Sequence, residues 1–157
     1  MEQQPQQFQT KGISYFDRIK KGLLFTIVIC LIILFIANSG NNLFLTITLP
    51  MIIFVVYGYE TLQWNKFYIT SLKIQDNNVE LEYLNYDKVV KLNLPLSEVN
   101  FKIRNIWYKV KPQHAYLQIT GSQGFRIRQH SGGYWNKELF MEVVGVVEGM
   151  GEMKTFN

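Results

Sequence analysis

Hydrophobic residues are concentrated in two runs in the N-terminal part of this 157-residue chain. Thirty-eight consecutive residues, 22–59, contain no Lys, Arg, Asp or Glu, and the polar segment 38–42 divides them. The apolar runs on either side, 23–37 and 43–59, each approach the minimum length for crossing a bilayer as a helix. The pattern therefore predicts a transmembrane hairpin of two helices over 22–59.

Two other interpretations of the apolar runs are open. A helical hairpin buried in a globular domain would need more chain around it, because both runs are apolar on every side. The first run could also be the core of a signal peptide, with cleavage near Ala37-Asn38-Ser39. However, 21 residues precede this run and a second apolar run follows it closely. The membrane hairpin is the favoured interpretation.

Positive charges beside the hairpin predict its orientation. The segment between the two runs carries no charge, whereas basic residues stand before the first run (Lys11, Arg18, Lys20, Lys21) and after the second (Lys66, Lys73). Flanks rich in Lys and Arg stay on the cytoplasmic side. We therefore expect a multi-pass protein of the cell inner membrane with cytoplasmic N- and C-termini, and Trp64 among the aromatic residues at the membrane interface. Residues 1–21 are expected to form a cytoplasmic leader, whose Gln-rich start, 1–10, has no regular structure. From Lys11 onward this leader is either an ordinary juxtamembrane segment, which is favoured, or a short amphipathic turn.

After residue 60 the pattern changes to an alternation of apolar and polar positions. This alternation, interrupted by turn residues, predicts short antiparallel strands. They are expected at 67–74, 79–83, 89–94, 99–104, 115–120 and 125–128, with 106–110 as a further short strand. Apolar residues at three- and four-residue spacings then predict an amphipathic helix over 134–149. The fold class expected for 60–157 is thus α+β.

The order and size of these elements resemble those of the bacterial membrane-anchored pleckstrin-homology-like (PH-like) families, in which two transmembrane helices precede a PH-like domain. The resemblance covers 22–59 and 67–150 and rests on no diagnostic motif. It implies a partly open antiparallel β-barrel of two packed sheets, closed by the C-terminal helix. Many PH domains carry a tryptophan in that helix, and Trp135 is the nearest candidate here. The resemblance does not imply phosphoinositide binding, because a fold does not fix a function.

Residues that could support catalysis or bind a metal ion are few. Cys30 is the only cysteine, and the two histidines, His114 and His130, lack the spacing of metal ligands. No nucleophile motif or phosphate-binding glycine loop occurs in the sequence. We therefore expect no catalytic residue, no metal site, no cofactor and no enzymatic activity.

The strongest functional signal is a segregation of charge. The segment 99–130 contains six basic residues and no acidic one: Lys102, Arg104, Lys109, Lys111, Arg126 and Arg128. Strand alternation points the bases of 101–104 and 125–128 away from the core. If these strands are near neighbours, their bases form one basic face, which Lys109 and Lys111 widen from a loop. Trp107 and Tyr108, beside the same loop, join Trp64 as candidate interface aromatics.

A basic face tethered to a membrane protein has two interpretations. Each Lys or Arg near acidic lipid contributes about 1 kcal/mol, so the face could bind anionic phospholipid headgroups or an acidic partner. Alternatively, it is a solvated surface that keeps the strands from pairing with other chains. Nucleic acid is not an expected partner, since no recognition helix or aromatic ladder accompanies the charge.

The sequence thus predicts a non-enzymatic membrane protein whose PH-like domain acts as a binding or scaffolding module. The alternative function is that of an accessory subunit of a larger membrane protein complex. In that case small or polar residues of the hairpin (Thr26, Cys30, Thr46, Thr48) would face partner helices.

Overall fold

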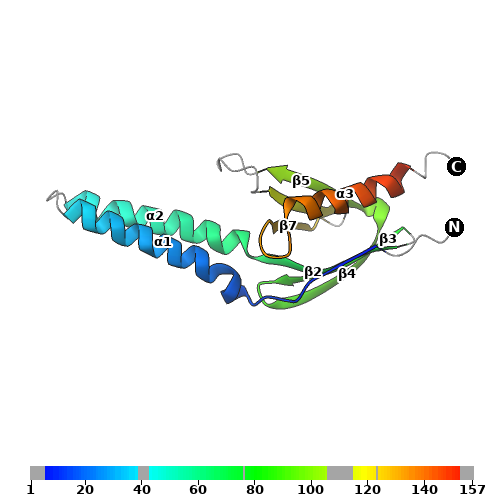
Figure 1. The fold of residues 1–157 in the computed structure, drawn as a ribbon, viewed down its shortest axis with the longest axis horizontal. Coiled ribbons are helices and arrows are strands. Elements are labelled where there is room, and N and C mark those ends of the chain that lie inside the picture. Colours follow the sequence, from blue (N-terminus) through cyan, green and yellow to red (C-terminus); the bar gives the residue numbers. More distant parts are fainter. Residues whose placement is uncertain (1–5, 39–42, 76, 106–114, 123, 153–157) are drawn as a thin grey trace. The chain divides into compact units, whose positions relative to one another are not determined.

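The computed structural model describes residues 6–38, 43–75, 77–105, 115–122 and 124–152, and the chain divides into two units (Figure 1). The helical unit comprises Ile13–Lys66. The sheet unit combines Met1–Gly12 with Phe67–Asn157. The chain therefore begins in the sheet unit, forms the helices, and then returns to complete the sheet unit. This division differs from the predicted one, in which a leader (1–21) and a hairpin (22–59) precede one continuous domain (60–157).

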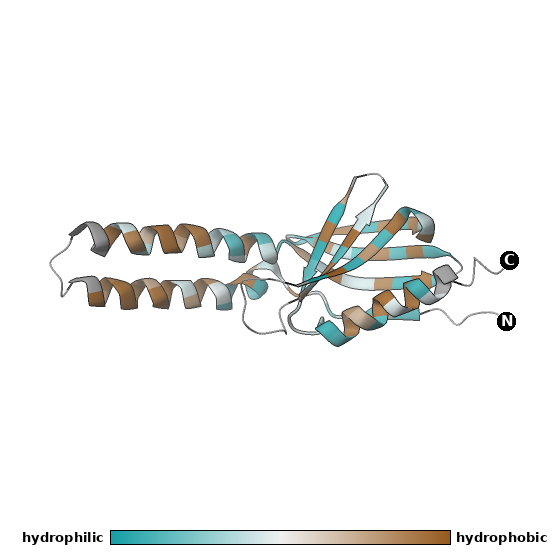
Figure 2. Cartoon of the chain, turned by 90° about the horizontal axis from the view of Figure 1, so that it is seen from above, coloured by the Kyte–Doolittle hydropathy of each residue, from teal (hydrophilic) through white to brown (hydrophobic). Residues whose placement is uncertain are grey.

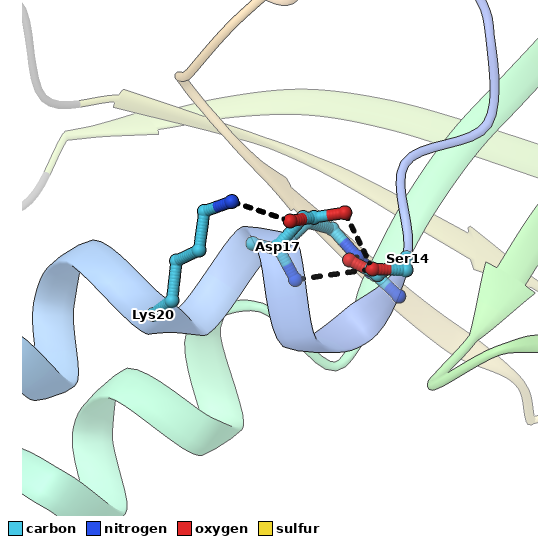
Figure 3. A network of polar contacts seen from close by, with 4 residues as sticks. Ser14, Asp17 and Lys20 are labelled. Carbon is cyan, nitrogen blue, oxygen red and sulfur yellow. Dashed lines mark hydrogen bonds and ion pairs between the residues drawn. The ribbon is translucent and has the colours of Figure 1, made fainter.

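The helical unit consists of α1 (Tyr15–Asn38) and α2 (Leu43–Trp64). Helix α1 begins within the predicted leader because Ser14 caps it (Figure 3). The Ser14 hydroxyl accepts a hydrogen bond from the Asp17 backbone N–H at 3.1 Å and donates one to the Asp17 carboxylate at 2.8 Å. Lys20 forms an ion pair with the same carboxylate. Such a cap satisfies backbone donors that have no partner inside the helix, and it fixes where the helix starts.

The two helices contact each other through small and polar residues. A Cβ atom added to Gly22 would lie 2.7 Å from Cγ2 of Thr61, so the glycine allows this close approach. Thr26 donates a hydrogen bond to the Gly22 carbonyl at 2.9 Å, and the Cys30 thiol donates one to the Pro50 carbonyl at 3.4 Å. Both donors are buried. These side chains therefore pack inside the hairpin rather than on its outer surface.

Most apolar side chains of the helical unit are exposed. In α1 they include Leu24, Phe25, Leu31, Phe35 and Ile36, with Phe35 83% exposed; in α2 they include Met51, Ile52 and Val55. Figure 2 shows hydrophobic residues along much of both helices and hydrophilic residues at the ends that join the strands.

One helix of the described residues, Tyr15–Ile36, is long and apolar enough to cross a membrane by length and composition. Of the two predicted spans, the described residues thus support one. The second apolar run, in α2, gives no further candidate span among the residues that the structure describes.

The sheet unit contains two antiparallel sheets (Figure 1). The first has the order β1-β2-β3-β4, with β1 Gln6–Gln9, β2 Phe67–Gln75, β3 Asn78–Asn85 and β4 Lys88–Pro95. After a 3-10 turn, η1 (Leu96–Glu98), the second sheet has the order β5-β6-β7, with β5 Val99–Asn105, β6 Ala115–Gly121 and β7 Arg126–His130. Helix α3 (Lys137–Glu152) follows. The described strands form two separate sheets and no closed barrel.

Strand β1 was not predicted. It pairs with β2 from Gln6↔Ile74 to Gln9↔Ser71, so the expectation of a leader without regular structure is wrong for these residues. Phe8 anchors the strand, since its side chain is buried whereas its neighbours are exposed. The first sheet is therefore built from segments that precede and follow the helical unit in the sequence.

The core of the sheet unit comes from the inward residues of both sheets and of α3. Ile69, Leu72, Leu117 and Ile119 are fully buried, together with Phe140 and Val143 of the helix. Helix α3 starts later than predicted, because Asn136 caps it by accepting a hydrogen bond from the Leu139 N–H at 2.8 Å. Trp135 therefore precedes the helix, although its ring is buried and stacks on that of Phe140.

Candidate functional site

The predicted basic strands lie on either side of β6. The register aligns Lys102 of β5 with Gln118 of β6, and Gln118 with Arg128 of β7. Residues aligned in this way point to the same face of a sheet. The two basic strands are thus two strand spacings apart, about 10 Å, rather than adjacent.

Two further rows complete this surface. On one side of the central row, Arg104 aligns with Tyr116 and His130; on the other, Thr120 aligns with Arg126. We call the surface the basic face, formed by the cations Lys102, Arg104, Arg126 and Arg128 and the β6 residues Tyr116, Gln118 and Thr120. All four cations are exposed.

The opposite face of the same sheet is buried. Residues that alternate with the cations, such as Phe101, Leu117 and Ile127, belong to the core. The prediction that strand alternation directs the bases away from the core is therefore confirmed for the described residues.

The charge of the basic face is not neutralised within the described part of the chain. The ion pairs described there join Lys20 to Asp17, Lys73 to Glu80 and Lys91 to Glu82. The last two lie on the first sheet, where the hydrogen bond from Lys91 holds the pKa of Glu82 below its ordinary value. Glu80 and Glu82 thus have lysine partners on their own sheet, and no described ion pair involves the cations of the basic face.

Tyr116 lies at the centre of a smaller cluster on this face. The guanidinium carbon of Arg128 is 5.8 Å from the centroid of the Tyr116 ring. The ring centroid of His130 is 5.1 Å from that of Tyr116, with an interplanar angle of 33°. Arg104 is the aligned neighbour of Tyr116 on the other strand. An aromatic ring is therefore placed among two arginines and a histidine.

The other predicted site residues are not part of this surface as described. Lys109, Lys111, Trp107 and Tyr108 lie outside the described residues, as does the predicted strand 106–110. Trp64 is the last residue of α2 and belongs to the helical unit. The structure thus brings together four of the six predicted cations.

Sequence reasoning missed Gln129, which joins the two sheets, and did not predict the contact that Trp135 makes with the first sheet. The Gln129 side chain accepts a hydrogen bond from the Ile69 N–H at 2.7 Å and donates one to the His130 carbonyl at 2.9 Å. The Trp135 indole donates to the Ile69 carbonyl at 2.8 Å. The register between β2 and β3 shifts between Ile69 and Ser71. At this irregularity, the side chains of Gln129 and Trp135 are hydrogen-bond partners of the Ile69 backbone. Alternation along β7 predicts an inward position for Gln129, and this signal could have identified it.

No group of three or more His, Cys, Asp or Glu side chains within the described ranges is arranged to hold a metal ion. Comparison of the sequence with protein-family models and with curated proteins returns no match.

Proposed function

We propose that this chain is a non-enzymatic protein of the cell inner membrane, in which the helical hairpin anchors a cytoplasmic, PH-like sheet unit that binds an anionic membrane surface. The observation that carries the proposal is the basic face. Four exposed cations share one side of a three-stranded sheet, and no described acidic side chain pairs with them.

The exposed apolar side chains of the hairpin support a membrane anchor. Burying a side chain such as Leu24 or Phe25 stabilises it by about 1.5 to 3 kcal/mol relative to water. Only 17% of the most apolar stretch of Tyr15–Ile36 is buried, whereas the core helix of a soluble protein is mostly buried. The hairpin therefore needs an apolar surrounding that the chain itself does not supply.

The pairing of β1 with β2 supports two crossings rather than one. These strands precede and follow the helical unit, and they exchange backbone hydrogen bonds in one sheet. A sheet of this kind lies on one side of a bilayer, so the chain between its strands crosses an even number of times. If α1 crosses, α2 must return. The pairing also argues against cleavage near Ser39, which would separate β1 from its sheet.

The magnitude of the proposed interaction follows from the number of cations. At about 1 kcal/mol for each basic residue near acidic lipid, four residues contribute about 4 kcal/mol. This corresponds to a preference of roughly 10³-fold for an anionic over a neutral surface. Because the attraction acts within a Debye length of about 8 Å at physiological salt, it requires the basic face to turn toward the bilayer.

A polarity-sensitive dye tests this proposal. The full-length protein, with Cys30 replaced by Ala, is labelled at Gln118→Cys on the basic face and placed in nanodiscs. We expect the emission to shift to the blue when phosphatidylglycerol is added to phosphatidylcholine, and the shift to reverse at high salt. A label at Asn93→Cys, on the first sheet, is the matched control.

Two results would contradict lipid binding by this face. One is an equal shift in pure phosphatidylcholine. The other is a shift that persists when Lys102, Arg104, Arg126 and Arg128 are all changed to Gln.

A second candidate function, as a subunit of a larger membrane complex, is supported by the same exposed apolar helices. These surfaces could pack against other transmembrane helices instead of lipid. Thr26 and Cys30 do not favour this function, because they are buried inside the hairpin. Extraction in a mild detergent distinguishes the two functions, since a subunit retains a stoichiometric protein partner.

A further inference from the structure

We infer that Arg104, Tyr116 and Arg128 form a site for a single phosphate monoester, within the wider basic face. The inference rests on the proposed function, in which this face meets an anionic surface, and it names the group that is recognised there. Its basis is that the four cations are not equivalent in their surroundings.

Arg126 and Arg128 differ although they share a strand and a face. Arg126 aligns with Thr120, a short side chain. Arg128 instead extends over the Tyr116 ring, with 5.8 Å between its guanidinium carbon and the ring centroid. Stacking on an aromatic face holds a guanidinium in a fixed orientation, which reduces the entropy lost when it binds a ligand.

Arg104 lies on β5, on the other side of β6 from Arg128. It is directly aligned with Tyr116 across the β5–β6 pair, where Cβ atoms are about 4.5 to 5.5 Å apart. His130, aligned with Tyr116 on β7, packs beside the ring, with 5.1 Å between the two ring centroids. The site therefore combines two guanidinium groups with one phenolic hydroxyl.

The chemistry of these groups selects the ligand. Guanidinium groups donate paired hydrogen bonds to phosphate oxygens, and the phenol can donate one more. A carboxylate has two oxygens, too few to meet both guanidinium forks and the hydroxyl. A phosphate monoester has three free oxygens and carries about −1.5 to −2 charge at neutral pH, whereas a diester has two free oxygens and one charge. The donor set therefore fits a monoester best.

A monoester phosphate can come from a lipid headgroup or from a soluble metabolite. The test uses the full-length protein in a neutral detergent and measures affinities by titration calorimetry. The probes are dihexanoyl phosphatidic acid, a lipid monoester; dihexanoyl phosphatidylglycerol, a lipid diester; and glycerol 3-phosphate, a soluble monoester. We expect phosphatidic acid to bind more tightly than phosphatidylglycerol.

The matched variants are Arg128→Gln and Arg126→Gln, which remove the same charge from the same strand. Losing a hydrogen bond to a charged group weakens binding about tenfold or more, so Arg128→Gln should weaken phosphatidic acid binding to this extent. Arg126→Gln should change it by only a few-fold. Tyr116→Phe keeps the stacking ring and removes the hydroxyl, and it should reduce the preference for the monoester.

The outcomes separate this inference from the proposed function. Equal losses in Arg126→Gln and Arg128→Gln, with acidic lipids still preferred over neutral ones, would overturn the Tyr116 site and leave the basic face as a diffuse surface. No preference for any acidic lipid would overturn both. Binding of glycerol 3-phosphate as tight as that of phosphatidic acid, with the same dependence on Arg128, would support the site and assign it a soluble ligand.

Discussion

Replacing Gln129 by Leu should destabilise the sheet unit more than any change of similar size on the basic face. Gln129 is 3% exposed, and its side chain supplies the partner of the Ile69 N–H, which is itself fully buried. Leu has a similar volume and no acceptor. The variant would therefore leave a buried donor without a partner, at a cost of about 1 to 3 kcal/mol. A domain of this size is stable by only about 5 to 15 kcal/mol, so the loss is a large share.

Hydrogen exchange measured by mass spectrometry on the full-length protein in neutral detergent is a suitable assay. The slowest amides of β2 exchange when the sheet unit opens, so their rates report its stability. A loss of 1 to 3 kcal/mol corresponds to exchange about 5- to 150-fold faster. Trp135→Phe, which removes the hydrogen bond to the Ile69 carbonyl and keeps an aromatic ring, should accelerate the same amides.

Gln118→Leu is the matched control, because Gln118 lies half-exposed on the neighbouring strand. Changes at such a surface position usually alter stability by no more than about 0.5 kcal/mol. Equal exchange rates in Gln129→Leu and Gln118→Leu would refute the assigned role of Gln129. Because Gln129 and Trp135 bond to the same residue, we expect the double variant to lose less than the sum of the two single losses.

Two further predictions concern the hairpin and the first sheet. Gly22→Ala should destabilise the hairpin by about 1 to 3 kcal/mol through overpacking against Thr61, as measured by thermal precipitation in detergent. Adding Thr61→Ala should restore the stability of the hairpin. Gly58→Ala is the control and should have little effect, because its Cβ would meet no atom within 4 Å. The pKa of Glu82 is lowered, chiefly by the hydrogen bond from Lys91. The stability this pair adds is therefore fully present above the ordinary glutamate pKa of about 4.3, and it is lost as the pH falls through the lowered pKa of the folded protein. Lys91→Met should therefore lower stability by less than about 1 kcal/mol near neutral pH, and the difference between the two proteins should shrink as the pH falls. A difference that does not shrink as acid is added would contradict this account.

The strands from β2 onward could be predicted because each alternates apolar and polar residues between recognisable turns. Strand β1 could not, since its sequence Gln-Gln-Phe-Gln contains one apolar residue and reads as a polar leader. Its conformation is set by β2, which supplies the hydrogen-bond partners and is separated from β1 by 57 residues. Because the paired residues are so far apart in the sequence, no local pattern indicates that β1 is a strand.

The candidate site was predicted in part for a similar reason. Alternation alone identified Lys102, Arg104, Arg126 and Arg128 as outward residues. It could not show that β6 lies between the two basic strands, nor that Tyr116 lies under Arg128, because both depend on strand order and register. The neutral β6 residues gave no signal in the sequence, although they separate the cations and give them different neighbours.

The insertion of the helical unit between β1 and β2 also constrains how the protein folds. The first sheet cannot be completed until the whole hairpin has been synthesised, because β1 precedes it and β2 follows it. If the hairpin enters the membrane as proposed, its two ends must emerge on the same side for β1 to find β2. Hydrophobicity gives one qualifying span among the described residues. Under the proposed function, the pairing of β1 with β2 calls for an even number of crossings. Sheet formation and the orientation of the hairpin are therefore coupled: a hairpin with only one helix inserted would leave β2 without its partner and Phe8 without its place in the core.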